Sequence, residues 1–474
     1  MTEVLLYVLG ILIFVVGLAV SIGLHEIGHL VPAKLFKVKV TQYMLGFGRT
    51  IWSKRKGETE YGVKLIPLGG YVAMTGMFPP GKPGEAPRAS TTGFLNTVVQ
   101  EGSALGTSGA STNVEARPDE APKRGVVGMV EDARLASAES IDEGEDHRTF
   151  YRLAPWKKIV IMLGGPLMNL VLAFVFFAIV LVGFGVPQNS TTLGQVSECL
   201  VSASSTATSC SSDDRAAPAA AAGLRPGDTI ISVDGTDITS WDQFRSIVSE
   251  APGTSLAVRI ERDGAEQTLQ LTPVENERAV TDASGKVVEN ADGTVKTEVV
   301  GMIGATPASE NVQQPITAVP AFLGENVQSV VGIVVRMPER MVDVWNAAFG
   351  SEARDPNGPI SVVGVGRMAG EIVSLEDAPV AARAQTIIGL LGSLNVALFV
   401  FNLVPLMPLD GGHIIGAVYE WLKRGIARML GRPDPGPIDT AKMAPVTMAV
   451  AVVLGAMLVL LVYADIVKPV SLFG

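Results

Sequence analysis

Four stretches of almost uninterrupted apolar residues divide the sequence, at residues 4–24, 159–186, 386–406 and 445–467. Each is long enough to cross a hydrocarbon layer of ~30 Å as a helix that rises ~1.5 Å per residue. The first stretch resembles a secretory signal peptide in length, but Glu3 stands where Lys or Arg is usual and no small-residue cleavage site follows. The pattern therefore predicts four transmembrane helices, with long polar segments after the first and after the second.

Residues 42–74, between the first two spans, change to the alternating pattern of β-strands. Pro67, Gly69 and Gly70 interrupt the alternation, so we expect strands bent by glycine that form a membrane-associated β-hairpin. A free strand edge there would let an extended peptide add to the sheet, with Gly69 and Gly70 permitting close backbone approach. From the residues alone, an ordinary cytoplasmic hairpin explains the pattern equally well.

A second run of strand and turn patterns follows the second span, over residues 216–274. The predicted elements are strands at 229–233, 255–261 and 266–271 and a helix at 240–250. Together with the run Gly-Leu-Arg-Pro-Gly-Asp at 223–228, this order resembles a PDZ domain, a fold that captures peptides by strand addition.

The other long segments carry weaker signals. Residues 79–145 are rich in Gly, Pro, Ser, Thr, Ala and acids, which predicts a disordered or loosely ordered insertion. Residues 316–348 alternate apolar clusters with Arg and Glu, which predicts amphipathic helices on the membrane surface. Residues 358–366 are apolar but shorter than a span, so we expect them to lie at the interface or to pack against the bundle.

These patterns predict a polytopic α-helical membrane protein with four transmembrane helices, a membrane-associated β-hairpin and an extracytoplasmic α+β PDZ-like domain. The expected parts, in order, are the first transmembrane helix with the hairpin (1–78), the low-complexity insertion (79–150), the second transmembrane helix (151–190), the PDZ-like domain with a Cys-containing insert (191–280), a linker with interfacial segments (281–383), and the third and fourth transmembrane helices (384–474).

Lys and Arg near the ends of the spans predict how the chain crosses the membrane. They gather after the first span, before the second, and between the third and the fourth. Such segments face the cytoplasm under the positive-inside rule. Both termini and residues 187–384 are then expected on the extracytoplasmic side.

Composition agrees with a membrane protein that has large aqueous parts. Of the 474 residues, 47% are hydrophobic, a mixture too apolar for most soluble proteins and too polar for a chain made only of spans. The net charge of -10, without a basic patch, argues against nucleic acid as a partner. Cys199 and Cys210, the only cysteines, are expected outside, where they either form a disulfide or stay free thiols.

The end of the first span carries the candidate chemistry. His25 and His29 are i and i+4 on a helix, so both imidazoles leave one face a turn apart, with Glu26 beside them. The pattern His-Glu-x-x-His is that of zinc proteases, in which two His hold the metal and the Glu is the general base. These residues would otherwise be interfacial polar groups, but a carboxylate within a membrane segment costs about 2.5–3.5 kcal/mol and is retained mainly where it functions.

A third ligand is expected near the end of the third span, because catalytic zinc takes three protein ligands and leaves a fourth position open. Pro405 and Pro408 break the helix there, and Asp410 follows where an unwound backbone can aim it into a cavity. Taken alone, Asp-Gly-Gly at 410–412 also fits a membrane-exit turn with a helix cap. His413 is the competing ligand, and we expect it to be a supporting or packing residue instead.

The second span has the features of a close helix contact. Gly164 and Gly165 predict tight packing and Pro166 predicts a kink. Asn169 places an amide among apolar residues, so we expect it to turn toward a partner and to line the substrate site.

Six motifs in this order resemble the site-2 protease family of intramembrane zinc metalloproteases, specifically the bacterial regulators with a single PDZ domain. The motifs are His25-Glu26-Ile-Gly-His29, Gly69-Gly70-Tyr71, Gly164-Gly165-Pro166-Leu-Met-Asn169, the PDZ-like domain, Gly358-Pro359-Ile360 and Asn402-x-x-Pro405-x-x-Pro408-Leu409-Asp410-Gly411. The resemblance covers most of the chain, except the 79–145 insertion and the region around residues 199–210.

The resemblance implies a Zn²⁺ ion on His25, His29 and Asp410, with Glu26 as the general base. It also implies proteolysis within the membrane of single-pass membrane proteins of the anti-sigma factor type, in regulated intramembrane proteolysis and signalling. The implied partners are these substrates, the lipid bilayer and a peptide ligand of the PDZ domain. The implied location is a bacterial cytoplasmic membrane, with the chain crossing it several times.

Substrate contacts follow from the same resemblance. Asn402 and Pro405 are expected to help hold the substrate. The strand that contains Gly69, Gly70 and Tyr71 is expected to clamp it in extended form.

Two other classes of protein are compatible with the residues. A membrane-anchored PDZ scaffold would use a structural metal site, which is closed by four protein ligands. A transporter would also place His and Asp inside the membrane, but the sequence lacks the paired halves that transporters often have.

Overall fold

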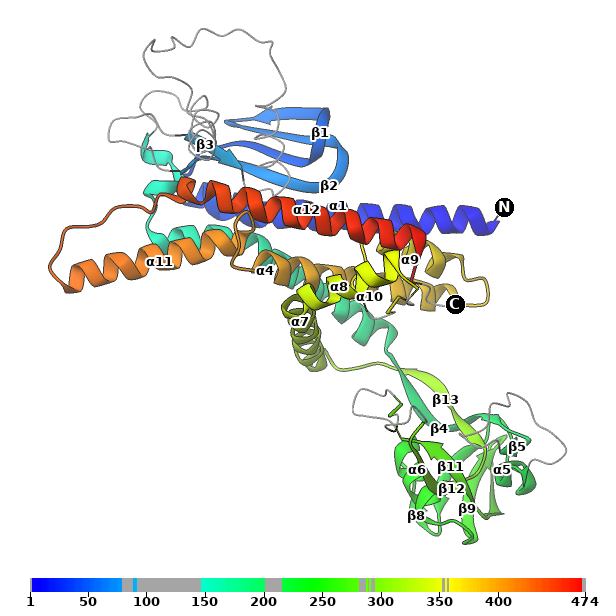
Figure 1. Cartoon of the computed structure of the whole chain (residues 1–474). Coiled ribbons are helices and arrows are strands. Elements are labelled where there is room, and N and C mark those ends of the chain that lie inside the picture. Colours follow the sequence, from blue (N-terminus) through cyan, green and yellow to red (C-terminus); the bar gives the residue numbers. More distant parts are fainter. Residues whose placement is uncertain are drawn as a thin grey trace, which may run out of the picture. The chain divides into compact units, whose positions relative to one another are not determined.

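The computed structural model describes residues 2–78, 88–91, 146–200, 215–280, 287–288, 290, 295–351, 354–355 and 358–470. The chain divides into two compact units, one made of Met1–Gly183 with Pro315–Gly474 and the other of Phe184–Gln314. Figure 1 shows the first as mainly helical and the second as mainly strands.

Among the described residues, five helices are long and apolar enough to cross a membrane. They are α1 (Thr2–Leu35), α4 (Pro155–Ala178, continued by a π-helical turn at Ile179–Phe184), α7 (Val319–Val335, preceded by a 3₁₀ turn at Ile316–Ala318), α10 (Val380–Asn402) and α12 (Ala444–Val467). Four of them overlap the predicted spans, although α10 ends at Asn402 and the predicted third span continued to residue 406. The fifth, α7, was expected to lie on the membrane surface, so the count of four spans is not confirmed.

The difference at α7 has a physical cause. The expectation of amphipathic helices rested on Arg336, Glu339 and Arg340. In the structure α7 ends before all three, and the last two belong to α8 (Met337–Phe349). Without them α7 retains a single charged residue, Glu325, and has the composition and length of a span.

Backbone contact holds α1 against α4. A Cβ atom on Gly28 would overlap the Gly164 carbonyl, and a Cβ on Gly164 would overlap the Gly28 carbonyl. The tight contact predicted for the second span is therefore confirmed, since only glycine lets two helices approach so closely. Gly10 meets Ala369 of α9 (Val362–Ser374) in the same way, so the short apolar segment packs against the bundle.

The strands β1 (Val40–Lys56), β2 (Thr59–Phe78) and β3 (Arg88–Thr91) form one antiparallel sheet. The long strands bend, so that residues 42–45 pair with 60–63 on one side and with 70–73 on the other. Tyr43 ties the sheet to α1, because its hydroxyl donates to the Gly23 carbonyl at 2.8 Å. The predicted glycine-bent strands are confirmed. Of the predicted low-complexity insertion, 79–87 and 92–145 lie outside the described residues.

The rest of the first unit connects these parts. The chain returns from the sheet through 3₁₀ turns at Asp146–Arg148 and Phe150–Arg152 into α4. After α10 it forms an irregular turn and then α11 (Asp410–Met429), and a 3₁₀ turn at Thr440–Met443 leads into α12.

The second unit is built on antiparallel strands in the order β10-β9-β7-β4-β13, with β8 beside β7. The elements are β4 (Val186–Val196), β5 (Cys199–Leu200), β6 (Arg215–Ala216), α5 (Pro218–Ala221), β7 (Thr229–Val233), β8 (Thr236–Asp237), α6 (Trp241–Glu250), β9 (Leu256–Arg262), β10 (Ala265–Leu271), β11 (Val274–Ala279), β12 (Thr297–Met302) and β13 (Ala305–Val312). The strands and the helix predicted between residues 229 and 271 are confirmed to within about a residue. Helix α6 buries Trp241, Phe244 and Val248 in the core of this unit.

The pairing of β4 with β13 makes this compact unit wider than the expected 191–280, because the two strands bring together residues 186–196 and 305–312. Cys199 is disulfide-bonded. Cys210 lies outside the described residues.

An ion pair between the buried Asp228 and the partly exposed Arg262 in the second unit leads to a prediction about pH. Arg262 donates from Nε and Nη2 to the two carboxylate oxygens of Asp228, both at 2.6 Å. Burial alone would raise the pKa of Asp228, but the hydrogen bonds from Arg262 outweigh burial and hold this pKa below its ordinary value. Because the folded-state pKa is lowered, the pair stabilises the unit fully at neutral pH and loses this effect as the pH falls below about 4.

Replacing Arg262 by Gln should therefore lower the amide-exchange protection of β7 and β9 by roughly tenfold at pH 7 in the full chain, since hydrogen bonds to charged groups are among the stronger ones. At low pH the variant and the wild type should converge. Arg259→Gln is the control, because Arg259 donates to the neutral Ser232 Oγ at 3.1 Å and its carboxylate partners, Asp237 and Glu266, are exposed and lie 3.6 Å away. An equal loss of amide-exchange protection in the two variants would contradict the role given to the pair of Arg262 and Asp228.

Candidate metal centre

Three side chains from two distant parts of the chain converge at the end of α1. The Nε2 atoms of His25 and His29 lie 3.2 Å apart. The Asp410 Oδ2 atom lies 3.4 Å from the first and 3.3 Å from the second. No fourth His, Cys, Asp or Glu joins this cluster in the part of the chain that the structure describes.

Helix α4 orients both imidazoles. His29 Nδ1 lies 2.8 Å from the Ile161 carbonyl, to which it donates, and this leaves Nε2 with a lone pair toward the cluster. His25 Nδ1 lies 3.0 Å from the Asn169 amide. Metal-binding His residues usually make such a hydrogen bond through the nitrogen that does not bind the metal.

The turn between α10 and α11 places the carboxylate. Asp410 is the first residue of α11, directly after the irregular turn that contains Pro405 and Pro408. A Cβ on Gly411 or on Gly412 would overlap the backbone of residues 403–407. The two glycines therefore allow α11 to begin close against the preceding turn, which brings Asp410 to the two His residues.

A buried ion pair fixes α11 further along. Lys158 of α4 donates to Glu420 of α11 at 2.7 Å, and both side chains are less than a tenth exposed. Glu420 also meets Arg424 at 2.9 Å. Because α4 also holds His25 and His29, one helix orients all three side chains of the cluster.

The cluster fits a zinc ion. Two atoms bound at ~2.0–2.1 Å to a tetrahedral zinc ion are separated by ~3.3 Å, which matches the three separations of 3.2, 3.3 and 3.4 Å. Asp410 Oδ2 is buried and accepts no hydrogen bond from the residues that the structure describes. Gly165 faces the cluster, and a Cβ there would lie 2.7 Å from His25 Nε2. The donors, the unpaired oxygen and the room left by this glycine all suit a cation.

Glu26 lies beside the cluster and is 4% exposed. A Cβ on Gly70 would lie 2.9 Å from Glu26 Cγ, so the backbone of β2 runs directly past this side chain. A carboxylate in this place can exchange a proton with a water molecule at the cluster.

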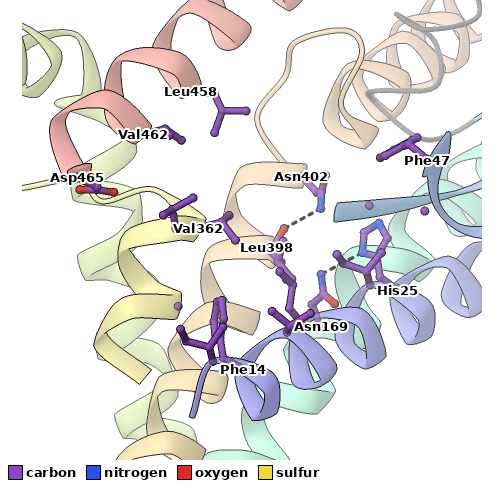
Figure 2. Close-up of a pocket in the computed structure, with 18 of the residues that line it drawn as sticks. Phe14, His25, Phe47, Asn169, Val362, Leu398, Asn402, Leu458, Val462 and Asp465 are labelled. Carbon is purple, nitrogen blue, oxygen red and sulfur yellow. Dashed lines mark hydrogen bonds between the residues drawn. The ribbon is translucent and has the colours of Figure 1, made fainter. Parts of the chain in front are cut away.

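A cavity of about 880 Å³ is lined by His25 and Asp410 of the cluster and by Glu26. Figure 2 shows His25 in this cavity beside Asn169. Its lining is mostly apolar and comes from α1, α9, α10 and α12 as well as the sheet. Four of the predicted substrate-binding residues line it, namely Gly69, Gly70, Asn169 and Asn402.

Two of the predicted substrate-binding residues lie away from the cavity lining. Tyr71 is buried in the sheet, where its hydroxyl donates to Gln42 Oε1 at 3.0 Å. Pro405 is exposed on the turn, and Pro408 is the proline of this turn that lines the cavity. His413, the competing ligand, is not part of the three-residue cluster. It follows Asp410 by three residues on α11.

Several residues that serve the site carry no clear signal in the sequence. Gly165 could be read as packing alone, but it faces both imidazoles. Lys158 could be read as a cytoplasmic flanking charge, but it is buried against Glu420. The far end of the cavity includes Asp465 of α12, and nothing in its sequence context points to this position.

Two His and one carboxylate around a position with space for a fourth ligand define a catalytic metal centre of the zinc hydrolase type. The chain matches the model of peptidase family M50 over residues 13–429 and belongs to this family. It is a membrane protein and a zinc metalloprotease, of the site-2 protease type.

The chain aligns with several zinc metalloproteases over their full length. The chain is 29% identical over 474 residues to zinc metalloprotease Rip1 of Mycobacterium bovis and to Rip1 of Mycobacterium tuberculosis, with 99% of this chain and 100% of each relative covered. It is 29% identical over 482 residues to Rip1 of Mycolicibacterium smegmatis, with the same coverage.

Proposed function

We propose that this protease hydrolyses peptide bonds inside the transmembrane segments of single-pass membrane proteins. The observation that carries the proposal is the extent of the apolar cavity, whose lining follows α1 from Tyr7 to Glu26. The nineteen helical steps from Tyr7 to Glu26 measure about 28 Å, close to the ~30 Å thickness of a hydrocarbon layer. The cavity therefore suits a membrane-spanning segment, and its reactive end holds the metal centre.

His25, His29 and Asp410 are the proposed zinc ligands, with their geometry set by α4 and α11. When bound, zinc supplies Lewis acidity for polarising a carbonyl and activating water. Glu26 is the proposed general base: its carboxylate takes a proton from the attacking water and returns it to the leaving amine. Asn169 holds the His25 ring in the orientation that exposes Nε2.

A helical substrate must unwind before it can react, because its carbonyls are bonded within the helix. We propose that the substrate adds as a strand beside Gly69 and Gly70, which would replace the lost hydrogen bonds. The support is the position of Gly70 against Glu26, since a strand added there runs past the proposed base. Asn402, whose amide donates to Leu398 O at 2.9 Å and which lines the cavity, is a further proposed contact.

The remaining features of the proposal come from the sequence motifs. We propose substrates of the anti-sigma factor type, in regulated intramembrane proteolysis, at a bacterial cytoplasmic membrane. Residues 184–314 are the proposed PDZ-like domain, placed outside the cell and able to bind a peptide. The sheet order and the helix α6 are compatible with such a domain.

The proposal is tested by reconstituting the full chain in vesicles with a single-span peptide that carries a helix-breaking residue in its apolar segment. Mass spectrometry of the products should locate a zinc-dependent cut inside the apolar segment. Cuts confined to the aqueous flanks of the peptide would contradict the proposal. A metal centre that binds zinc but gives no cleavage of any membrane peptide would favour the PDZ scaffold.

A further inference from the structure

The outer face of α11 carries an apolar stripe that nothing in the described chain covers. Ile415, Tyr419, Leu422, Ile426 and Met429 follow one another at the spacing of a single helix face. Their side chains are 53–87% exposed. Helix α11 is not among the five candidate spans, so this stripe is not explained by a membrane crossing.

Positively charged residues lie on and just after α11, near the stripe. Residues 421–433 contain Lys423, Arg424, Arg428 and Arg432 and no acidic residue. Arg424 is paired with Glu420 and Asp434, which flank this segment. Lys423 borders the stripe, and Arg428 lies on the polar side of the helix. An exposed apolar face on a cationic helix is typical of helices that lie in the interface of an anionic bilayer.

The connections of α11 keep it at the membrane. It begins eight residues after the end of α10 and is followed by α12, and both of these helices are candidate spans. In Figure 1 the C-terminal part of α11 (orange) extends past the helix on which it packs. A bilayer is therefore the apolar surface that this stripe meets first.

We propose that the stripe of α11 docks on the anionic headgroup and acyl boundary of the membrane leaflet that lies beside the α10–α12 connection. The opposite face of α11 is fixed to α4 by Lys158 and Glu420. Contact with lipid thus fixes the other face of α11, the one that carries the stripe. Because Asp410 is the first residue of the same helix, this contact also supports the carboxylate of the metal centre.

The experiment places a nitroxide label on single cysteines in the full chain, reconstituted in vesicles of phosphatidylcholine with phosphatidylglycerol. Ile426→Cys and Leu422→Cys report on the stripe. Trp421→Cys is the matched control, because Trp421 is 62% exposed but lies on the other side of the helix. Labelling without reductant leaves the Cys199 disulfide intact.

The two stripe labels should be reached by oxygen and protected from a water-soluble nickel complex, whereas the control should be reached by the nickel complex. Replacing Lys423, which borders the stripe, by Gln should move the stripe labels toward water in these vesicles, and should have little effect in phosphatidylcholine alone. Stripe labels open to the nickel complex would overturn the proposal. Protection from both reagents with spin coupling between chains would overturn it as well, since a second copy would then cover the stripe.

Discussion

Replacing Glu26 by Gln is expected to lower cleavage of a membrane peptide by a factor of roughly 10²–10⁴, the usual contribution of a positioned general base. The amide keeps the size of the side chain and its place against Gly70, but it cannot accept the proton of water. Zinc content should not change, because Glu26 is not in the ligand cluster. The measurement is the initial rate of product formation, with zinc determined on the same sample.

Glu3→Gln is the matched control for this variant, because Glu3 is on the same helix and exposed. It should cleave at the wild-type rate. Turnover by Glu26→Gln within a few-fold of the wild type would remove Glu26 from the mechanism. Loss of zinc together with activity would instead indicate a structural role.

Replacing Gly165 by Ala is expected to abolish zinc binding at the wild-type affinity, and activity with it. The new methyl group would lie 2.7 Å from His25 Nε2 and would also overlap the His29 ring. At least one imidazole must therefore move, and a displacement of 1 Å at a catalytic site costs about 10²-fold in rate. The measurements are zinc affinity by competition with a chelator and the cleavage rate.

The harmful effect expected of Gly165→Ala is the opposite of what this substitution usually does inside a helix. Gly→Ala inside a helix usually stabilises by roughly 0.5–1 kcal/mol. Gly389→Ala in α10 is the control, since a Cβ there meets nothing within 4 Å. It should keep full zinc binding and activity. Wild-type zinc affinity in Gly165→Ala would show that the site does not need the space left by this glycine.

The sequence was sufficient for the parts of the fold that depend on local pattern. An apolar run predicts a span whatever its neighbours are, and the strands between residues 229 and 271 are marked by turns on both sides. The pairing of His25 with His29 also follows from helix geometry alone. For these reasons α1, α4, α10, α12 and the strands β7, β9 and β10 could be predicted before the structure.

Contacts between distant residues could not be predicted in the same way. Lys158 and Glu420 are 262 residues apart, and a charge in a sequence does not indicate its partner. The assignment of Asp410 needed a family resemblance, because a turn with a helix cap has the same local sequence. The length and composition of α7 could not be predicted for a related reason, since the helix boundary before Arg336 decides whether the charges belong to it.

Pro405 and Tyr71 show a further limit of motif reasoning. A motif assigns a role to neighbouring residues together, but alternate residues of a strand point to opposite faces. In the turn after α10, Pro408 lines the cavity and Pro405 is exposed. Only coordinates distinguish residues that meet a substrate from those that shape the backbone around them.

The central claim is that His25, His29 and Asp410 together hold one zinc ion. The most direct test is the zinc content of the purified full chain, compared between the wild type and Asp410→Ala. His413→Ala tests the competing ligand, and the exposed Asp377→Ala is the matched control. We expect about one zinc per chain in the wild type, His413→Ala and Asp377→Ala, and little zinc in Asp410→Ala. Full zinc content in Asp410→Ala, with loss of zinc in His413→Ala, would contradict the claim.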